Sequence, residues 1–538
     1  MNQDPVSAAA DNSNPNDSPS DTPGESHAGG GTGSDQTSQA EQIQSLNHSD
    51  EKYVASSELP VSIETAFAYH ERPGCLNRLI PPWQSVEIVS SDGSLKPGSR
   101  VTLKTRIAGV PVRWEARHTE YEPPHRFADV QDSGPFAAWH HEHRFVASNP
   151  PDTNSDSGEV DQSNRDVDAG TETAEMASAT FGCRLTDSVD YRLPGGSVGK
   201  LFGRSMARRE LETMFAYRHR VTRDDLQLVA DYPVDPMTVA ISGSNGLVGR
   251  SLSHLLTLLG HRVIPLVRSD RAGEDAIAAW GDPSEVEKFN GVDAVIHLAG
   301  KSIASGRWSE SVKQEIRDSR VDMTRQLCER IAPISNPPST LICASATGYY
   351  GDRGDEWLEE TSSPGDDFLA EVAQEWESAC DPARQASLRV VHARFGIIVS
   401  PQGGALQKML FPAKCFGGKL GSGRQHWSWM ALDDVLGGIV HALCTPDLSG
   451  AVNFVAPDPL TNTEFTQVLG RVLNRPPLLP APATALRLAL GEMADALLLA
   501  STRVRPTRLI ESGYRFRFTD LEELLRYQLG RERLESVE

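Results

Sequence analysis

The sequence predicts an α/β fold built on a doubly wound parallel sheet, with an α+β region before it and a small domain after it. A β-branched strand, a glycine-rich turn, a helix and a second strand follow one another within residues 238–267, which is the repeating unit of a parallel sheet. Earlier strand-like runs with a period of two predict an antiparallel sheet. The 538 residues suffice for about three to four domains. We expect a disordered acidic tail (1–52), the α+β region (53–230), the parallel-sheet domain (237–475) and the small C-terminal domain (476–530).

Charge and composition exclude some classes of partner. The formal net charge is −21, and the acidic excess of residues 1–60 and 148–180 accounts for 16 of these charges. Because the remaining chain has no large basic excess, we expect no nucleic-acid partner. Residues 1–52 and 148–178 are nearly free of large apolar residues, so we expect disorder in this tail and in this insert. We interpret the insert as an expanded hairpin loop.

No targeting or membrane signal is expected. The start MNQDPVSAAADNSNPND has neither a basic n-region nor an apolar core, so a secretory signal is not predicted. The most apolar later stretch, Leu478–Ala500, contains Arg487, Glu492 and Asp495 and is too polar for a membrane span. The seven Cys are scattered and form no C-x-x-C pair, which disfavours zinc sites and a disulfide framework. We therefore expect a cytoplasmic protein.

The α+β region begins with a predicted helix over Ser62–His70 and ends with a longer one over Val198–Val221. Between them we expect strands at Ser85–Val89, Arg100–Ile107, Val112–Tyr121, Arg126–Gln131, His140–Val146 and Thr180–Arg192. This order, together with the run PVSIETAFAYHERPGCLNRLIPPW, resembles the START-like (SRPBCC, polyketide-cyclase-like) superfamily. The resemblance implies a helix-grip fold and an apolar ligand cavity between sheet and helix. A plainly packed core is the alternative.

Three histidines lie close together in this region. Alternation along a strand puts His141 and His143 on one face and His140 on the other, and two histidines on one face could hold a metal ion. No Cys and no carboxylate other than Glu142 stands at ligand spacing along the chain. We therefore expect a solvated strand face and no metal site.

The strongest functional signal is the glycine-rich turn. The strand Thr238–Ser242 runs into Gly243-Ser244-Asn245-Gly246-Leu247-Val248-Gly249, and a helix and the strand Arg262–Val267 follow. In such a unit the first glycine permits the tight turn and the second lets a pyrophosphate approach the backbone. The third lets the helix pack close to the sheet, and the amides of its first turn face the anion. The turn therefore predicts a dinucleotide-binding, Rossmann-type domain.

The choice between the two nicotinamide cofactors depends on the end of the second strand. The spacing G-x-x-G-x-x-G resembles extended and atypical short-chain dehydrogenase/reductases. Arg268 follows the strand, where an acid would bind the ribose hydroxyls of NAD. A guanidinium can instead pair with the 2′-phosphate of NADP. We favour NADP over NAD, although Asp270 keeps NAD open.

A later strand supplies the other side of the expected cofactor site. The run Gly291–Gly300 ends in His297-Leu298-Ala299-Gly300, which resembles the N/H-x-A-G segment of these reductases. The resemblance implies that Leu298, Ala299 and Gly300 pass over the adenine and ribose side of the cofactor, where larger side chains would collide with it.

Further motifs narrow the resemblance to one subgroup. In order stand Gly306-Arg307-Trp308, Lys313–Arg320 (KQEIRDSR), Ser345–Gly351 (SATGYYG), Phe368–Val372 (FLAEV), Gly421–Gln425 (GSGRQ), Trp427-Ser428-Trp429 and Leu432-Asp433-Asp434-Val435. Over 237–530 the chain closely resembles the atypical reductases labelled "epimerase family protein", which carry a small C-terminal domain. The resemblance implies an oxidoreductase or epimerase that acts on a small or nucleotide-linked substrate.

The chain lacks the usual catalytic pair of short-chain reductases. Ser345 stands at the end of an apolar strand, where the family's substrate-orienting hydroxyl lies. Phe368 occupies the position of the general-acid Tyr, and no Lys follows it. Tyr349 is the freer candidate for a proton donor, with aromatic packing as the alternative. Glu371 and Glu375 are expected on an exposed helix face.

Two arginines are candidates for a substrate or cofactor phosphate. Arg394 ends a predicted strand and Arg424 lies in a glycine-rich turn, in stretches that line the substrate cleft of extended reductases. Lys313, Arg317 and Arg320 share one helical stripe, which we interpret as a solvated face.

Two functions remain open at this stage. One is an NADP-dependent oxidoreductase or epimerase that uses Ser345 with an atypical proton donor. The other is a non-catalytic NADP-binding protein whose START-like domain binds an apolar ligand or a partner. The absent Tyr/Lys pair favours the second, and the intact Ser345 with its neighbouring arginines favours the first.

Overall fold

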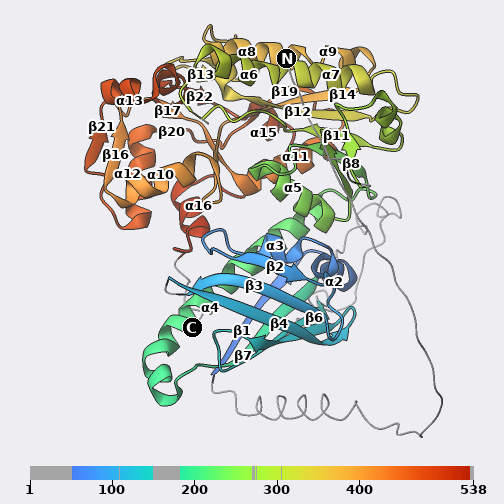
Figure 1. Ribbon diagram of the computed structural model, residues 1–538, viewed down its shortest axis with the longest axis vertical. Helices are drawn as coiled ribbons and strands as arrows, with labels where there is room; N and C mark the ends of the chain where they lie inside the picture. The colour runs from blue at the N-terminus through green and yellow to red at the C-terminus, as the bar shows by residue number, and fades with distance from the viewer. Residues whose placement is uncertain are drawn as a thin grey trace, which may run out of the picture. The chain divides into compact units, whose positions relative to one another are not determined.

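The computed structural model describes residues 51–107, 109–148, 182–268, 273, 275–304 and 306–532, without the side chains of 197–202. The predicted tail, apart from Glu51 and Lys52, and the predicted insert, apart from Ser148, lie outside the described residues. Two seven-stranded sheets organise the described part (Figure 1).

The first sheet is antiparallel throughout and has the order β1-β7-β6-β5-β4-β3-β2. Its strands are β1 (Glu51–Leu59), β2 (Glu87–Ser91), β3 (Arg100–Ile107), β4 (Val110–Glu122), β5 (Arg126–Ser133), β6 (Ala138–Ala147) and β7 (Cys183–Arg192). Six of the strands match predicted runs. Strand β1 is not predicted, and Glu51 and Lys52 belong to it rather than to a tail.

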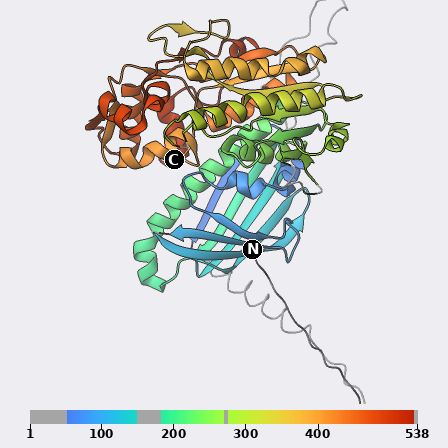
Figure 2. The same cartoon turned by 45° about the horizontal axis from the view of Figure 1, so that its top comes forward.

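Three helices accompany this sheet: α2 (Ile63–Glu71), α3 (Cys75–Leu79) and α4 (Gly196–Asp231). Helix α4 is ten residues longer at its C-terminal end than predicted and lies along the sheet (Figure 2). Leu211 and Phe215 of α4 pack against Trp139 and Val189 of the sheet. A long helix held against a curved antiparallel sheet is the predicted helix-grip arrangement.

The second sheet is parallel throughout and has the order β10-β9-β8-β11-β12-β14-β19. Its strands are β8 (Thr238–Ser242), β9 (Arg262–Val267), β10 (Ile277–Ala278), β11 (Ala294–His297), β12 (Thr340–Ala346), β14 (Arg389–Phe395) and β19 (Gly450–Phe454). Counted from β8, the order 3-2-1-4-5-6-7 reverses between β8 and β11. Ligands of such sheets bind at this switch point, outside the carboxyl ends of the strands.

Helices cover both faces of the parallel sheet, as the fold class predicts. Helices α5 (Leu247–Leu258) and α11 (Leu432–Cys444) share one apolar core with β8 and β11. Helices α7 (Val321–Ile331) and α8 (Phe368–Ser378) contribute to the core on the other face.

The connecting elements are η2 (Pro283–Phe289), α6 (Glu310–Asp318), η3 (Thr347–Tyr350), β13 (Trp357–Leu358), α9 (Asp381–Gln385), β15 (Ile397–Val399), α10 (Gly404–Lys414), β16 (Gly417–Leu420), β17 (His426–Trp427), β18 (Trp429–Ala431), β20 (Leu460–Thr461) and α12 (Asn462–Leu473).

The chain after 476 forms short elements that attach to the parallel-sheet region. These are β21 (Leu479–Ala481), α13 (Ala483–Leu490), α14 (Glu492–Ala494), η4 (Asp495–Leu499), β22 (Arg503–Val504), α15 (Thr507–Glu511) and α16 (Leu521–Gln528). Strand β21 pairs with β16, and β22 pairs with β13. Among the described residues, no helix has the length and apolar character needed to cross a membrane.

A buried network of charges joins α3, α4, α11 and the segment before α16. Arg78 contacts Asp225 at 2.8 Å and Asp433 at 2.7 Å, and Arg517 contacts Asp225 at 3.1 Å. Burial alone would raise the pKa of Asp225, but the two guanidinium groups hold it below its usual value. Removing one member would leave its partners buried and unpaired, which makes the network a strong constraint on packing.

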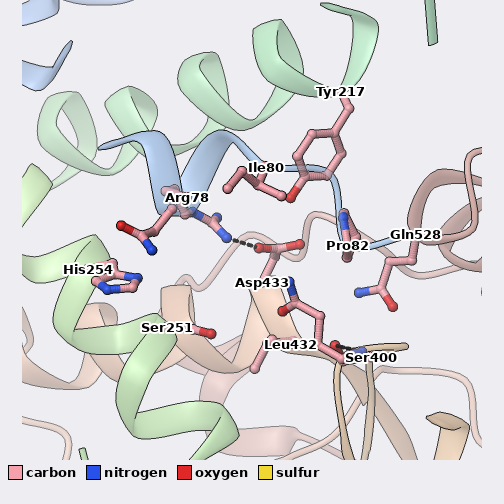
Figure 3. A pocket seen from close by; sticks show the side chains of 12 residues that line it. Arg78, Ile80, Pro82, Tyr217, Ser251, His254, Ser400, Leu432, Asp433 and Gln528 are labelled. Atoms are coloured by element: carbon pink, nitrogen blue, oxygen red, sulfur yellow. Dashed lines mark hydrogen bonds and ion pairs between the residues drawn. The ribbon is translucent and has the colours of Figure 1, made fainter. Parts of the chain in front are cut away.

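A small cavity lies beside this network (Figure 3). Its volume is about 40 Å³, and Ser251, His254, Ser400 and Asp433 are among the residues that line it. One or two water molecules fit such a space, whereas a metabolite does not. The switch point of the parallel sheet is the candidate position for a larger ligand.

Candidate nucleotide site

The glycine turn has the tight geometry that its sequence predicts. Gly243 has a φ of +71°, and a Cβ there would lie 2.9 Å from the carbonyl carbon of Leu298. A Cβ on Gly249 would lie 2.3 Å from the carbonyl oxygen of Gly243, so the close approach of α5 requires glycine. Gly246 differs, because its φ of −74° and ψ of 173° suit any residue. The residue is exposed, although a Cβ there would lie 3.2 Å from the Gly243 carbonyl oxygen.

The start of α5 offers backbone donors. Gly246 is its N-cap and provides no side-chain hydrogen bond to the first turn. The amides of Leu247, Val248 and Gly249 have no intrahelical acceptor, as at any helix start. Together with the exposed Asn245 and half-buried Ser244, they form a cradle that fits a pyrophosphate.

Ser242 and His297 fix the other side of the switch point. The Ser242 hydroxyl accepts hydrogen bonds from the amides of Leu298 (3.0 Å) and Ala299 (3.2 Å) and lies 2.7 Å from Nδ1 of His297. Because the hydroxyl accepts twice, its own hydrogen is available for His297. Sequence reasoning singled out 298–300 but missed Ser242, which holds the backbone of this segment in place.

Neutral His297 should make stability depend on pH. Burial lowers the pKa of His297 to about 4, whereas an unfolded chain has about 6.5. The stability that this residue contributes is complete above pH ~6.5 and is lost as the pH falls toward 4, because only the unfolded chain takes up the proton. We expect its contribution to the free energy of unfolding to fall by about 3 kcal/mol over that range.

Urea unfolding at a series of pH values checks this expectation. His297→Asn keeps an acceptor for Ser242 but cannot be protonated, so the fall in stability should be shallower in the variant. Part of the slope remains, because burial also lowers the pKa of His392 to about 4. Equal slopes in both proteins would show that His297 does not titrate as its burial requires.

Arg268 lies at the end of β9 and is exposed. Its side chain therefore has room to reach a ligand at the carboxyl edge of the sheet. Asp270, the alternative residue for a ribose contact, lies outside the described residues together with the rest of 269–272.

Ser345 belongs to a buried hydrogen-bond network. Its hydroxyl donates to Glu377 at 2.7 Å, and the same carboxylate receives two hydrogen bonds of 2.8 Å from Arg394. Arg394 also donates to the Tyr350 hydroxyl at 3.0 Å, which donates to Asn453 at 2.7 Å. Burial alone would raise the pKa of Glu377, but Arg394 lowers it. Arg394 is 3% exposed, so its charge is already neutralised by Glu377 rather than held out toward a ligand.

Tyr349 lies on the outer side of this network. The Arg394 guanidinium carbon is 3.5 Å from the centre of its ring. The Tyr349 ring is half-buried, and among the described residues no partner is found for its hydroxyl. The guanidinium therefore fixes the ring by stacking while the hydroxyl stays available.

Phe368, which we expected to stand in place of a general-acid Tyr, begins α8. The Lys313 ammonium lies 5.1 Å from the centre of its ring and 2.5 Å from Glu492. Trp308 packs edge-on against the same ring. The position is thus filled by an aromatic ring with a lysine from another helix beside it.

The charged stripe on α6 and just beyond it is not a solvated face. Arg317 contacts Glu371 at 3.4 Å and Glu375 at 3.5 Å, so these acids are paired rather than free. Arg320 is largely buried, which lowers its pKa to about 10, and no acid contacts it among the described residues. A Cβ on Gly300 would lie 3.4 Å from its guanidinium carbon. The helical spacing placed Arg320 on one stripe with Lys313 and Arg317. It could not show that the Arg320 guanidinium lies next to the 298–300 segment.

Arg424 lies apart from the Ser345 network. It is exposed in the turn between β16 and β17, and its backbone amide donates to Ser422 at 3.2 Å. Among the described residues, nothing joins it to Ser345, Tyr349 or Arg394.

The expected solvated face of the histidine pair is wrong. His141 is 4% exposed, and the side chain of His143 is 13% exposed. Both point to the inner side of the antiparallel sheet, where Asp129 on β5 and Asp187 on β7 contact them. The carboxylates come from neighbouring strands, so spacing along the chain could not show them. They were detectable only from the strand register, which pairs His141 with Asp129 and His143 with Asp187.

A parallel sheet with a glycine turn at its switch point defines a dinucleotide-binding protein of the short-chain dehydrogenase/reductase type. The family comparisons agree. Residues 239–454 match the NAD dependent epimerase/dehydratase family, and 59–216 match the family of polyketide cyclase / dehydrase and lipid transport. Residues 481–528 match a domain of unknown function (DUF1731).

Relatives cover the second half of the chain. The epimerase family protein Mb2239 of Mycobacterium bovis is 42% identical over 298 residues, which are 54% of this chain and 98% of that protein. The human epimerase family protein SDR39U1 is 32% identical over 297 residues, 54% of this chain and 99% of the human protein. The chain therefore belongs to the epimerase family of short-chain dehydrogenase/reductase-like proteins, with a polyketide-cyclase-type domain fused before it.

Solved structures extend the likeness to both regions. The crystal structure of the nucleoside-diphosphate sugar epimerase from Corynebacterium glutamicum has a TM-score of 0.66 and 33% identity, and covers 90% of this chain and 91% of its own. That of human SDR39U1 with NADPH has a TM-score of 0.50 and 31% identity, and covers 55% of this chain and 99% of its own.

Proposed function

We propose that this protein is an NADP-dependent oxidoreductase or epimerase that acts on a small or nucleotide-linked substrate. The observation that carries the proposal is the cradle at the switch point, formed by Gly243, Gly246 and Gly249 with the first turn of α5. The 298–300 segment, held by Ser242, closes the cradle on its other side. Bound there, the nicotinamide would supply or accept a hydride. The NADPH of the human relative and the sugar epimerase from C. glutamicum support this class of cofactor and substrate.

In this proposal Tyr349 moves the proton and Ser345 positions groups around it. The Tyr349 hydroxyl has no partner among the described residues, and its ring is fixed by Arg394. Ser345 already donates to Glu377, so it acts by holding Glu377 and Arg394 under the ring. Arg394 is therefore a positioning residue. Arg320 is half-buried beside the 298–300 segment, and no acid contacts it among the described residues. It is a further candidate for an anionic group of cofactor or substrate.

Arg268 should set the choice of cofactor. A guanidinium can make two charge-assisted hydrogen bonds to a 2′-phosphate, each worth about 1.5–3 kcal/mol. We expect NADPH to bind at least about tenfold more tightly than NADH, because about 1.4 kcal/mol is a factor of ten. Arg268→Ala should weaken NADPH alone. Calorimetric titration with both nucleotides measures the preference.

Arg262→Ala provides the matched control, because Arg262 is an exposed arginine at the opposite end of the same strand. It should leave both affinities unchanged. Equal affinities of the wild type for NADPH and NADH would contradict the role of Arg268 and favour Asp270 as the ribose contact. A preference that survives Arg268→Ala would place the phosphate on another cation, such as Arg320.

A second candidate function is a non-catalytic NADP-binding protein whose START-like domain binds an apolar ligand or a partner. Two observations favour it: Phe368 has no hydroxyl, and the Ser345 hydroxyl is engaged by Glu377. Turnover is measured in two ways: as loss of NADPH absorbance with small ketones, and as conversion of nucleoside-diphosphate sugars to their epimers in the presence of NADP, because epimerisation consumes no cofactor. Turnover that Tyr349→Phe abolishes supports the enzyme. NADPH binding without turnover, unaffected by Tyr349→Phe, supports the second candidate.

A further inference from the structure

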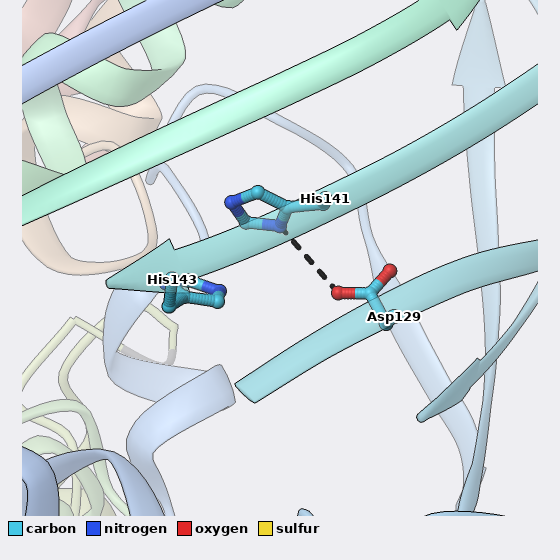
Figure 4. Close-up of side chains that lie close together, drawn as sticks. All are labelled: Asp129, His141 and His143. Carbon is cyan, nitrogen blue, oxygen red and sulfur yellow. Dashed lines mark ion pairs between the residues drawn. The ribbon is translucent and has the colours of Figure 1, made fainter. Parts of the chain in front are cut away.

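We propose that the START-like domain binds a divalent transition-metal ion through Asp129, His141 and His143. One ligand atom from each side chain lies within 4.8 Å of the other two (Figure 4). The site is independent of the nucleotide site and of the function proposed for it.

The strand register places these three side chains together. Asp129 on β5 lies directly opposite His141 on β6, and His143 follows two residues later on the same face. The His143 ring stacks on Phe127 with centres 4.1 Å apart, and the two histidine rings are 4.0 Å apart. The ligands are thus carried by paired strands and packed side chains, which hold their geometry better than loops.

Asp187 already provides the outer support that metal-bound histidines use. Nε2 of His141 is hydrogen-bonded to Asp187 Oδ1 at 3.1 Å, and Nδ1 of His143 lies 2.5 Å from the same oxygen. This leaves Nδ1 of His141, which faces Asp129 at 3.5 Å, as the nitrogen for the ion. A histidine that binds a metal ion usually donates its other ring N–H to a carboxylate, and this chain presents that arrangement.

Asp187 is shared by three histidines, His141, His143 and His219. Nε2 of His219 on α4 also reaches Asp187, at 2.7 Å. Nδ1 of His143 and Nε2 of His219 are buried without a well-directed hydrogen bond. A dication bound at Asp129, His141 and His143 would balance the negative charge of Asp129 and Asp187.

The donor set identifies the class of ion. Two imidazoles and a carboxylate suit Zn²⁺ or Fe²⁺, whereas Mg²⁺ and Ca²⁺ prefer oxygen ligands. Asp129 and His143 keep 16% and 13% of their side-chain surface exposed, against 5% for His141. The site is therefore enclosed but retains a route for the ion.

Calorimetric titration of the chelator-treated full chain with Zn²⁺ tests the proposal. We expect one saturable equivalent in the wild type and an affinity at least about tenfold weaker in Asp129→Asn and in His143→Gln. Asp187→Asn removes only the outer support and should weaken binding by about 10–100-fold. His140→Gln is the matched control, because His140 lies between the two ligands on the opposite face of β6, and it should bind like the wild type.

X-ray absorption of the Zn²⁺-loaded wild type keeps the proposal testable if a variant fails to fold. The expected first shell contains two imidazole nitrogens at about 2.0–2.1 Å and oxygen, without sulfur. No saturable binding, or an equal loss in His140→Gln, overturns the site. So does a shell containing sulfur, which would place the ion on a cysteine such as the exposed Cys415.

Discussion

Gly246→Val should abolish NADPH binding while the fold stays intact. Gly246 is the N-cap of α5 with backbone angles open to any residue, so valine adds no backbone strain. Its Cβ would lie 3.2 Å from the Gly243 carbonyl oxygen, which requires only a small adjustment. The branched methyl groups would project from the exposed surface where the pyrophosphate must approach. We expect an affinity at least about 100-fold weaker, or about 2.7 kcal/mol.

Calorimetric titration with NADPH and a thermal melt of each variant measure the two parts of this expectation. Thr257→Val is the control, because it places a valine near the far end of the same helix, away from the glycine turn. Gly243→Ala and Gly249→Ala are poorer tests, since a positive φ or a close backbone contact would disturb the turn itself. NADPH affinity unchanged by Gly246→Val, with an unchanged melting temperature, would place the pyrophosphate elsewhere.

Glu377→Met should destabilise the protein by about 3–5 kcal/mol. Glu377 neutralises Arg394, whose side chain is 4% exposed, and its loss leaves a buried charge without a partner. Ser345 also loses the acceptor of its hydrogen bond. The double variant Glu377→Met/Arg394→Met should recover most of the loss, because apolar side chains of similar volume often replace a buried ion pair at little cost.

Denaturant unfolding of the wild type, both single variants and the double variant measures the coupling. Arg317→Met is the comparison, since Arg317 pairs with Glu371, whose side chain is 57% exposed. That pair should contribute less than about 1 kcal/mol. A Glu377→Met variant no less stable than Arg317→Met would mean that water or another group solvates Arg394.

The parts of the fold that sequence reasoning predicted are those that local chemistry dictates. The glycine turn is recognisable in the sequence because its requirements are local. Gly243 needs a positive φ, and Gly249 needs a close backbone contact only a few residues away. Strand β1 was missed because its sequence EKYVASSEL alternates only small and polar residues around Tyr53 and Val54. Its pairing with β7, which is far along the chain, makes it a strand.

The same distinction between local and long-range determinants applies to the candidate sites. Ser345 was found at a strand end, but its partner Glu377 lies 32 residues later on α8, and no local pattern connects them. The sequence could not show that Asp129 and Asp187 contact the histidines, because only the pairing of neighbouring strands brings them together. A sequence shows which side chains are able to do chemistry, whereas long-range pairing decides which of them meet.

The charge network at Arg78 has a consequence for how the chain is divided. Arg78 and Asp225 belong to the START-like half, whereas Asp433 and Arg517, which contact them, belong to the reductase-like half. A cut between α4 and β8 would leave Arg78 and Asp225 with each other, but Asp433 would lose Arg78 and Arg517 would lose Asp225. Because these contacts join the two halves, we expect the melting of one half to destabilise the other, so that a thermal melt of the full chain shows one transition.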